Sequence, residues 1–162
     1  MNLKIKKLNP NAIIPTYGSK DAAGMDLYAL LDKDTERILP NETKLIHTGI
    51  SVAIPEGYVG LIFARSGLAT KHGLAPANKV GVIDADYRGE IMVALHNHQS
   101  EMKAKNWDEG DFNPAYNTEA INNGDRIAQM VIVPYIHADL EEVDELDKTV
   151  RGEGGFGSTG TN

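Results

Sequence analysis

The central part of the sequence carries residues that could do hydrolytic chemistry. Two apolar runs, 79–83 and 90–95, flank the polar hexapeptide Asp-Ala-Asp-Tyr-Arg-Gly. Asp84 directly follows an apolar pair, so we expect its carboxylate at a strand end, where partial burial favours a general base over a solvated charge. Tyr87 offers a flat aromatic face at the turn. The two runs predict a hairpin. The alternatives are an ordinary turn-forming Asp and an ordinary cross-strand aromatic.

A second polar group lies where an apolar strand pattern gives way to a short helical one. Arg65, Ser66 and Gly67 supply a guanidinium fork, a hydroxyl and an unhindered backbone N–H. This combination suits a phosphate or another oxyanion, and the alternative is a plain surface turn. Further along the chain, Arg126 and Gln129 lie beside an apolar strand pattern. An inward-pointing Arg needs a carboxylate partner, and the candidate partner is Asp26.

The last twelve residues, RGEGGFGSTGTN, include five glycines and cannot bury a core. Three of these glycines have GxGxxG spacing, but a dinucleotide-binding loop must open a helix, and only five residues follow Gly157. The segment is therefore expected to be a mobile strip of backbone N–H groups that could wrap phosphates and place a ring over a base. The alternative is a terminus without a role. Its side chains that could contact a ligand are Arg151, Phe156, Ser158 and Thr159.

Short apolar runs between Gly, Pro, Asn and Asp residues must position these groups. The runs predict strands at 44–54, 58–63, 79–83, 90–96 and 126–133. Their near-regular spacing is typical of an all-β sandwich or barrel. Short helical segments are predicted at 66–71 and 117–122.

Composition limits the classes of protein to which the chain can belong. A length of 162 residues, 41% of them hydrophobic, is enough for one domain with its own core. The net charge of -7 argues against direct nucleic-acid binding, so local cations must meet any phosphate. The absence of Cys excludes disulfides and thiol catalysis. Without a membrane span or a signal peptide in the sequence, we expect a cytoplasmic protein that does not bind membranes.

Five segments, in this order, resemble the homotrimeric dUTPase family, the deoxyuridine triphosphate nucleotidohydrolases. They are DAAGMDLYA (21–29), ARSGLA (64–69), NKVGVIDADYRGE (78–90), GDRIAQM (124–130) and RGEGGFGSTG (151–160). The resemblance implies an all-β, jelly-roll-like β-barrel of the dUTPase β-clip type, assembled as a homotrimer. It divides the chain into a barrel domain, 1–147, with an inserted loop at about 99–123, and a flexible arm, 148–162. In this family the arm closes over the active site of another subunit.

The activity implied by the resemblance is hydrolysis of dUTP to dUMP and pyrophosphate. This reaction limits uracil incorporation into DNA and supplies dUMP for thymidylate synthesis. Asp84 would activate the water that attacks the α-phosphorus. The residues that would contact base and sugar are Asn78, Gly81, Val82, Ile83, Tyr87 and Phe156. The residues that would hold phosphates are Arg65, Ser66, Gly67, Gln129, Arg151, Gly157, Ser158 and Thr159.

A Mg²⁺ cofactor is also implied by the resemblance. The triphosphate and water would hold this ion without a direct protein ligand. Asp26, paired with Arg126, would organise the hydration shell of the ion. A metal held by His96 and His98 is disfavoured, because no third ligand lies at a useful spacing.

The sequence departs from the family pattern at two places. Ala64 replaces the usual Pro, which leaves the contacting residues intact. The segment 99–123 is much longer than usual, and its aromatic residues could form a surface for a protein partner. The alternative is a packed or mobile surface loop. These aromatic residues are Trp107, Phe112 and Tyr116.

Two other functions compete with dUTP hydrolysis. The related dCTP deaminases carry a Glu where this chain has Ala94, and deamination needs that acid/base group. Hydrolysis is therefore favoured. A non-enzymatic nucleotide-sensing or protein-binding role is the other alternative, and the presence of both Asp84 and Tyr87 argues for catalysis.

Overall fold

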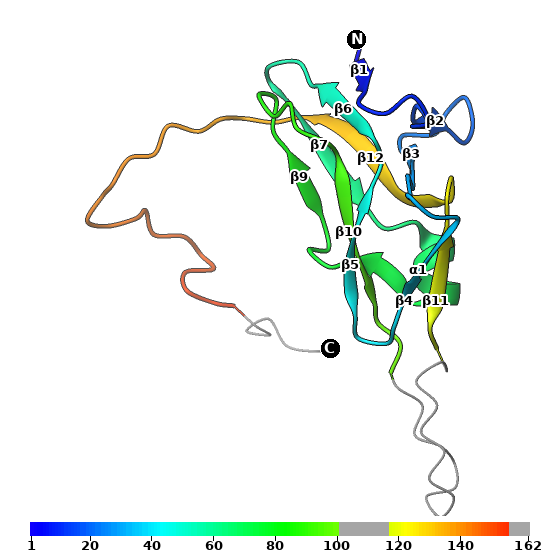
Figure 1. Cartoon of the computed structure of the whole chain (residues 1–162). Helices are drawn as coiled ribbons and strands as arrows, with labels where there is room; N and C mark the ends of the chain where they lie inside the picture. The colour runs from blue at the N-terminus through cyan, green and yellow to red at the C-terminus, as the bar shows by residue number, and fades with distance from the viewer. Residues whose placement is uncertain (101–116, 156–162) are drawn as a thin grey trace, which may run out of the picture.

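The computed structural model describes residues 1–100 and 117–155. Within these residues the chain forms twelve short strands and one helix (Figure 1). The strands are β1 (Lys4–Lys7), β2 (Thr16–Tyr17), β3 (Met25–Tyr28), β4 (Thr35–Ile38), β5 (Thr43–His47), β6 (Ile50–Ala53), β7 (Tyr58–Phe63), β8 (Leu74–Pro76), β9 (Gly81–Ile83), β10 (Met92–Asn97), β11 (Glu119–Asn122) and β12 (Arg126–Pro134). The helix is α1 (Ser66–His72).

The strands form four antiparallel sheets around one apolar core. The largest sheet has the order β2-β3-β12-β7-β9, and a three-stranded sheet has the order β5-β10-β8. The strands β1 and β6 form one two-stranded sheet, and β4 and β11 form another. Each sheet buries side chains in the same core, for example Leu27 of β3, Ile46 of β5, Ile50 of β6 and Ile121 of β11. The predicted all-β class is therefore confirmed.

The predicted hairpin at 79–95 is wrong. Strand β9 pairs with β7, whereas β10 pairs with β5 and β8, so the two runs belong to different sheets. The residues between them form a turn that connects these sheets. The apolar run 90–96 is nevertheless a strand over most of its length. The run 44–54 is divided into β5 and β6 at Gly49, which has a φ of 68° that few residues other than glycine adopt.

The helix predicted at 66–71 is confirmed as α1, whereas the segment predicted to be helical at 117–122 contains β11. Arg65, with extended backbone, precedes α1, and Gly73 ends it in the left-handed conformation. Lys71 and His72 lie in the last turn, where positive charge favours the helix dipole. Within the described ranges, no helix is long and apolar enough to cross a bilayer.

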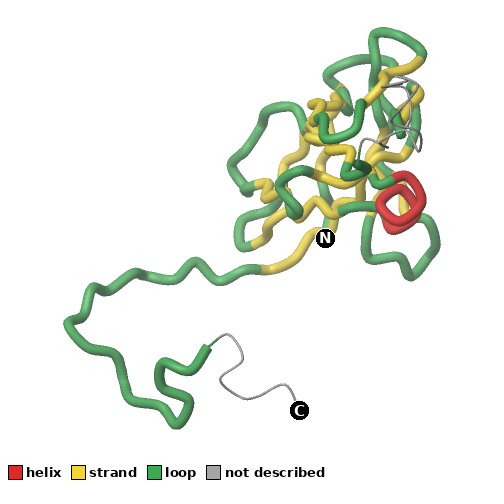
Figure 2. Tube along the Cα trace, turned by 90° about the horizontal axis from the view of Figure 1, so that it is seen from below, coloured by secondary structure: helices red, strands yellow, loops and turns green. Residues whose placement is uncertain are grey.

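The chain leaves the body of the protein after β12. The backbone N–H of Tyr135 donates to the carbonyl of Gly57 at 3.1 Å, and the described residues beyond it extend away from the sheets (Figures 1 and 2). Apolar side chains along this segment are exposed to solvent, including Ile136, Leu140 and Leu146. An extended segment that leaves so much apolar surface uncovered is suited to packing against another molecule.

Candidate active site

A buried carboxylate gathers three of the residues that the sequence singled out. Asp26 is only 3% exposed. Its Oδ1 accepts hydrogen bonds from Nε of Arg65 at 2.9 Å and from Nε2 of Gln129 at 3.4 Å. Its Oδ2 accepts from Nη1 of Arg126 at 3.3 Å. Two guanidinium groups surround one carboxylate, so the cluster keeps one net positive charge. We call these four residues the Asp26 cluster.

The strand register explains how the Asp26 cluster forms. Gln129 of β12 lies between Asp26 of β3 and Phe63 of β7, so three neighbouring strands contribute to one row of the sheet. Arg65 lies two residues after the end of β7. Its side chain returns to the row of Asp26, Gln129 and Phe63, where it contacts Asp26. The register of β3 and β12 shifts between Arg126 and Ala128. Such a bulge re-aims side chains at sheet edges.

The phosphate-binding segment predicted at Arg65, Ser66 and Gly67 lies at the junction of β7 and α1. The side chain of Arg65 is 25% exposed, and its Nη1 also donates to the carbonyl of Arg126 at 3.1 Å. Ser66 and Gly67 are exposed. A Cβ atom added at Gly67 would meet nothing within 4 Å, so the backbone here is open to an approaching anion.

A small cavity coincides with the predicted base-reading residues. Its volume is about 100 Å³, and Asn78, Gly81, Val82 and Ile83 all line it. A Cβ atom at Gly81 would lie 3.2 Å from Cβ of Ile62 and 3.5 Å from Nδ2 of Asn78, so a side chain at this position would narrow the cavity. The remaining lining residues are Ile62, Pro76, Met92, Val93 and Ala94. Most of the lining side chains are apolar, but the surface of the cavity is about as polar as apolar. Apolar walls combined with a few polar groups suit a flat heterocycle.

Asp84 and Tyr87 lie in the turn that follows this cavity. Asp84 comes directly after β9, as expected, but it is exposed in the single chain, so the partial burial that we expected is not found. The reason is that β9 is the edge strand of its sheet and pairs only with β7. The backbone N–H of Tyr87 donates to the carbonyl of Asp84 at 3.2 Å, which closes the turn. The phenol of Tyr87 is 40% exposed.

The predicted residues of the arm are not brought to these groups in the single chain. Arg151 is exposed, and its Nε donates locally to the carbonyl of Gly154 at 2.8 Å. This part of the arm lies away from the sheets (Figure 1). The other predicted arm residues, namely Phe156, Gly157, Ser158 and Thr159, lie outside the described residues, as do Trp107, Phe112 and Tyr116 of the insert.

Metal-binding side chains do not cluster in the described ranges, where no group of three His, Asp or Glu residues could hold an ion. His96 and His98 pack edge to face, with ring centroids 4.4 Å apart. Burial, helped by the nearby charges of Lys79 and His96, lowers the pKa of His98. Nδ1 of His96 is within hydrogen-bond distance, 2.8 Å, of the Thr43 hydroxyl.

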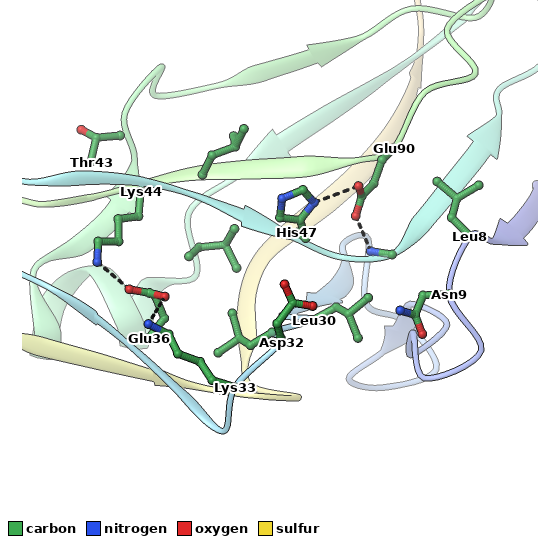
Figure 3. Close-up of a pocket in the computed structure, with 14 residues that line it drawn as sticks. Leu8, Asn9, Leu30, Asp32, Lys33, Glu36, Thr43, Lys44, His47 and Glu90 are labelled. Carbon is green, nitrogen blue, oxygen red and sulfur yellow. Dashed lines mark hydrogen bonds and ion pairs between the residues drawn. The ribbon is translucent and has the colours of Figure 1, made fainter.

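A larger hollow of about 820 Å³ contains none of the predicted site residues (Figure 3). At one end Glu36 meets Lys33 and Lys44, and at the other Glu90 meets His47 and the backbone N–H of Gly49. Glu90 was not among the residues predicted from the sequence, and the contact between Arg65 and Asp26 was not expected. No local pattern could have indicated either contact, because the partners are 41 and 39 positions apart.

The fold and the site define an all-β protein with a base-sized cavity, an adjoining exposed carboxylate and a cationic cluster suited to phosphate. Residues 10–106 and 112–160 match the family model described as dUTPase. A relative from Nautilia profundicola, a deoxyuridine 5'-triphosphate nucleotidohydrolase, is 49% identical over 99% of both chains. This chain belongs to the dUTPase family.

Solved structures of dUTPases superpose on this chain. The Staphylococcus bacteriophage 80alpha dUTPase with dUPNHPP has a TM-score of 0.84 and 34% identity, covering 99% of both chains. A mutant of the dUTPase from phage phi11 of S. aureus, described with a structural Mg(II) ion, has a TM-score of 0.76 and 32% identity over 91% of this chain and 100% of that one. These similarities confirm the predicted dUTPase-like, jelly-roll type of β-fold.

Proposed function

We propose that this chain hydrolyses dUTP to dUMP and pyrophosphate. One observation carries the proposal most directly: Asp84 directly follows Ile83, the last residue of β9 that lines the cavity, so a base held there would place its phosphates near an exposed carboxylate. Ala94 lines the same cavity where a deaminase would need an acid/base group. Hydrolysis is therefore the reaction that these side chains support.

The base and the sugar would be recognised by shape and by backbone groups. Asn78 and the backbone of Gly81, Val82 and Ile83 would read the polar edge of uracil. Tyr87, exposed at the turn beside the cavity, would pack on the deoxyribose and leave no room for a 2′-hydroxyl. Phe156 of the arm would cover the base. Steric exclusion of a ribonucleotide typically lowers its kcat/KM by about one to two orders of magnitude relative to that of the deoxyribonucleotide.

The triphosphate would be held by cations that the fold has already oriented. Arg65, Ser66 and Gly67 would bind it at the start of α1, and Gln129 would add an amide donor. The Asp26 cluster supports this role, because Asp26 and the carbonyl of Arg126 hold Nε and Nη1 of Arg65 at 2.9 and 3.1 Å and leave its Nη2 for a ligand. From the arm, Arg151, Gly157, Ser158 and Thr159 would complete the phosphate contacts.

Asp84 would act as the general base. Its carboxylate would accept a proton from a water molecule as the water oxygen forms a bond to the α-phosphorus. The bond between that phosphorus and the oxygen bridging to the β-phosphorus would break, so that pyrophosphate leaves with the electron pair. Proton transfer of this kind typically contributes about 10²–10⁴-fold to the rate.

The residues present fit a Mg²⁺ ion that is held through water. Both oxygens of Asp26 already accept hydrogen bonds from Arg65, Arg126 and Gln129, so this carboxylate is not free to act as a direct ligand. Mg²⁺ in nucleotide sites keeps several waters and binds the substrate phosphates. The ion would neutralise charge on the phosphates as the α-phosphorus is attacked. The site on Oδ2 that these three contacts leave unused would accept a hydrogen bond from the hydration shell of the ion.

We further propose that the chain acts as a homotrimer with the arm, 148–162, placed on a neighbouring subunit. Two observations support this arrangement. Asp84 is exposed directly after an edge strand, and the described part of the arm extends away from its own sheets with apolar side chains uncovered. Both features would be satisfied by burial against a second copy.

The cellular role follows from the reaction. Removal of dUTP would limit uracil incorporation into DNA, and dUMP would feed thymidylate synthesis. We propose the cytoplasm as its compartment, because its substrate belongs to the intracellular nucleotide pool. A partner surface on the insert, 99–123, stays a separate prediction, whose aromatic residues lie outside the described ranges.

A substrate panel tests the proposed function. Pyrophosphate release would be measured from dUTP, dTTP, dCTP and UTP with Mg²⁺, with the products identified by chromatography. We expect hydrolysis of dUTP alone, lost in Asp84→Asn and retained in the matched control Asp86→Asn, which changes another exposed carboxylate of the same turn. Deaminated products from dCTP, or full turnover by Asp84→Asn, would contradict the proposal.

A further inference from the structure

We propose that Glu90 is a positioning residue for discrimination between deoxyribose and ribose. Its carboxylate binds the end of the turn 84–90 to the loop between β5 and β6. This contact fixes the position of Tyr87. The inference rests on the proposed function, in which Tyr87 packs on the sugar.

The position of Tyr87 depends on the backbone of Gly89 and Glu90. Its hydroxyl donates to the carbonyl of Glu90 at 3.0 Å. A Cβ atom at Gly89 would overlap the phenol ring, so the ring lies directly against this glycine. Tyr87 therefore moves whenever the backbone at Gly89 and Glu90 moves.

Four contacts hold residues 88–91, on both sides of Gly89, to the segment 47–51. The hydroxyl of Thr48 donates to the carbonyl of Ile91, and the N–H of Ile91 donates to the carbonyl of Ile50 at 2.8 Å. The hydroxyl of Ser51 donates to the carbonyl of Arg88 at 3.0 Å. The fourth contact is the one made by the carboxylate of Glu90.

The carboxylate of Glu90 connects two independent donors. Its Oε1 accepts from the N–H of Gly49 at 2.7 Å, and its Oε2 lies 2.9 Å from Nδ1 of His47 (Figure 3). Burial opposes the charged form of Glu90, but the hydrogen bonds from His47 and Gly49 outweigh it and lower the pKa of Glu90. The carboxylate is therefore ionised at neutral pH, and charge-assisted hydrogen bonds are the stronger ones.

The loop that receives Glu90 is itself rigid. Gly49 has a φ of 68°, and a Cβ atom there would overlap the side chains of Leu30 and Ala12. Thr48 is 1% exposed. Glu90 thus joins the turn that carries Tyr87 to a fixed part of the core, and a small displacement at such a site is enough to weaken selection.

The test compares Glu90→Ala and Glu90→Gln with the wild type. The measured quantity is the ratio of kcat/KM for UTP to kcat/KM for dUTP. We expect Glu90→Ala to raise this ratio about tenfold, while kcat for dUTP changes by less than about threefold. Glu90→Gln keeps an acceptor for Gly49, so its ratio should rise less. If Glu90→Ala fails to fold, Glu90→Gln alone carries the test through the same ratio, which must then exceed that of the wild type.

Glu36→Gln is the matched control. Glu36 lies at the other end of the same hollow, paired with Lys33 and Lys44 and with no contact to the turn among the described residues. The ratio should stay at the wild-type value in this variant. An equal rise in Glu36→Gln would show a general loosening of the fold and would overturn the specific role of Glu90.

A double-mutant cycle separates action through Tyr87 from other effects. Tyr87→Phe keeps the ring but removes the hydroxyl that reaches Glu90. If Glu90 acts through Tyr87, the Glu90→Ala substitution should change the ratio less in the Tyr87→Phe background than in the wild type. If the effects of the two substitutions on the logarithm of this ratio are strictly additive, the inference is overturned. A wild type that does not discriminate between dUTP and UTP would instead overturn the proposed function, so the two failures are distinguishable.

Discussion

Nε of Arg65 lies 2.9 Å from Oδ1 of Asp26, although the two residues are 39 positions apart in the chain. Asp26 belongs to β3, and Arg65 follows β7, which is separated from β3 in the sheet by β12. The same carboxylate also meets Arg126 and Gln129. One buried acid therefore orients two cations and an amide, so the side chains proposed to bind phosphate are placed before any ligand arrives.

Loss of this carboxylate should affect both stability and substrate binding. In Asp26→Asn the two guanidinium groups lose their negative partner, and because they are partly exposed we expect a loss of about 2 kcal/mol in the free energy of unfolding. The KM for dUTP should rise, since Arg65 is no longer held in place. Urea denaturation and steady-state kinetics measure the two effects. Asp21→Asn, at an exposed position in the same segment, is the control. Wild-type stability and KM in Asp26→Asn would refute the proposed role.

A methyl group at Gly81 should close part of the base-sized cavity. Its Cβ would lie 3.2 Å from Cβ of Ile62, closer than ordinary contacts, and would crowd the amide of Asn78. The added methyl group would take space that the base needs, and a loss of about 1.4 kcal/mol or more in transition-state binding should lower kcat/KM for dUTP roughly tenfold or more. Gly18→Ala is a suitable control, because a Cβ there meets nothing within 4 Å. If both variants hydrolyse dUTP equally well, the cavity does not hold the base.

Removal of residues 151–162 should leave a folded protein that turns over poorly. The described residues beyond Tyr135 lie away from the sheets and are mostly exposed, so the truncation removes little that the core needs. We expect the Tm to change by less than about 2 °C and kcat to fall about a hundredfold, because the arm would no longer exclude water from the site. Calorimetry and kinetics check this. Full turnover by the truncated protein would eliminate the proposed closing role of the arm.

The ion pairs of Glu36 should make the free energy of unfolding depend on pH in the acid range. Hydrogen bonds from Lys33 and then Lys44 lower the pKa of Glu36 from 4.5 to about 2. Because the unfolded chain binds this proton more tightly, the contribution of Glu36 is complete above pH 4.5 and is lost as the pH falls towards 2. Near pH 7, Glu36→Gln should be less stable by about 0.5–1 kcal/mol. Denaturation of both proteins from pH 7 to 2 should show the two curves converge in acid. A constant gap would contradict the assignment.

Local features of this fold could be predicted from the sequence, whereas long-range pairings could not. Helix α1 was predictable, because its last turn is basic and Gly73 ends it. The segment at 119–122 contains good helix formers, but pairing with β4 makes it a strand. The hairpin prediction failed for the same reason. The runs around Asp84 are close in sequence, yet β9 and β10 find their partners in β7, β5 and β8.

The candidate site shows the same division. Four of the six residues expected to contact the base or the sugar line one cavity, because they lie on one strand and the turn before it. The pairing of Asp26 with Arg126 was also expected and is present at 3.3 Å. In contrast, the anchoring of Glu90 by Gly49 depends on how two sheets meet, and no spacing in the sequence reports that. The exposure of Asp84 likewise follows from the edge position of β9.

The position of attack tests the central claim most directly. A single turnover of dUTP in ¹⁸O-labelled water, followed by mass spectrometry of both products, reports which phosphorus the water attacks. If a water activated by Asp84 attacks the α-phosphorus, dUMP will carry one ¹⁸O atom and pyrophosphate will carry none. Label in pyrophosphate with unlabelled dUMP would place the attack on the β-phosphorus and contradict the account.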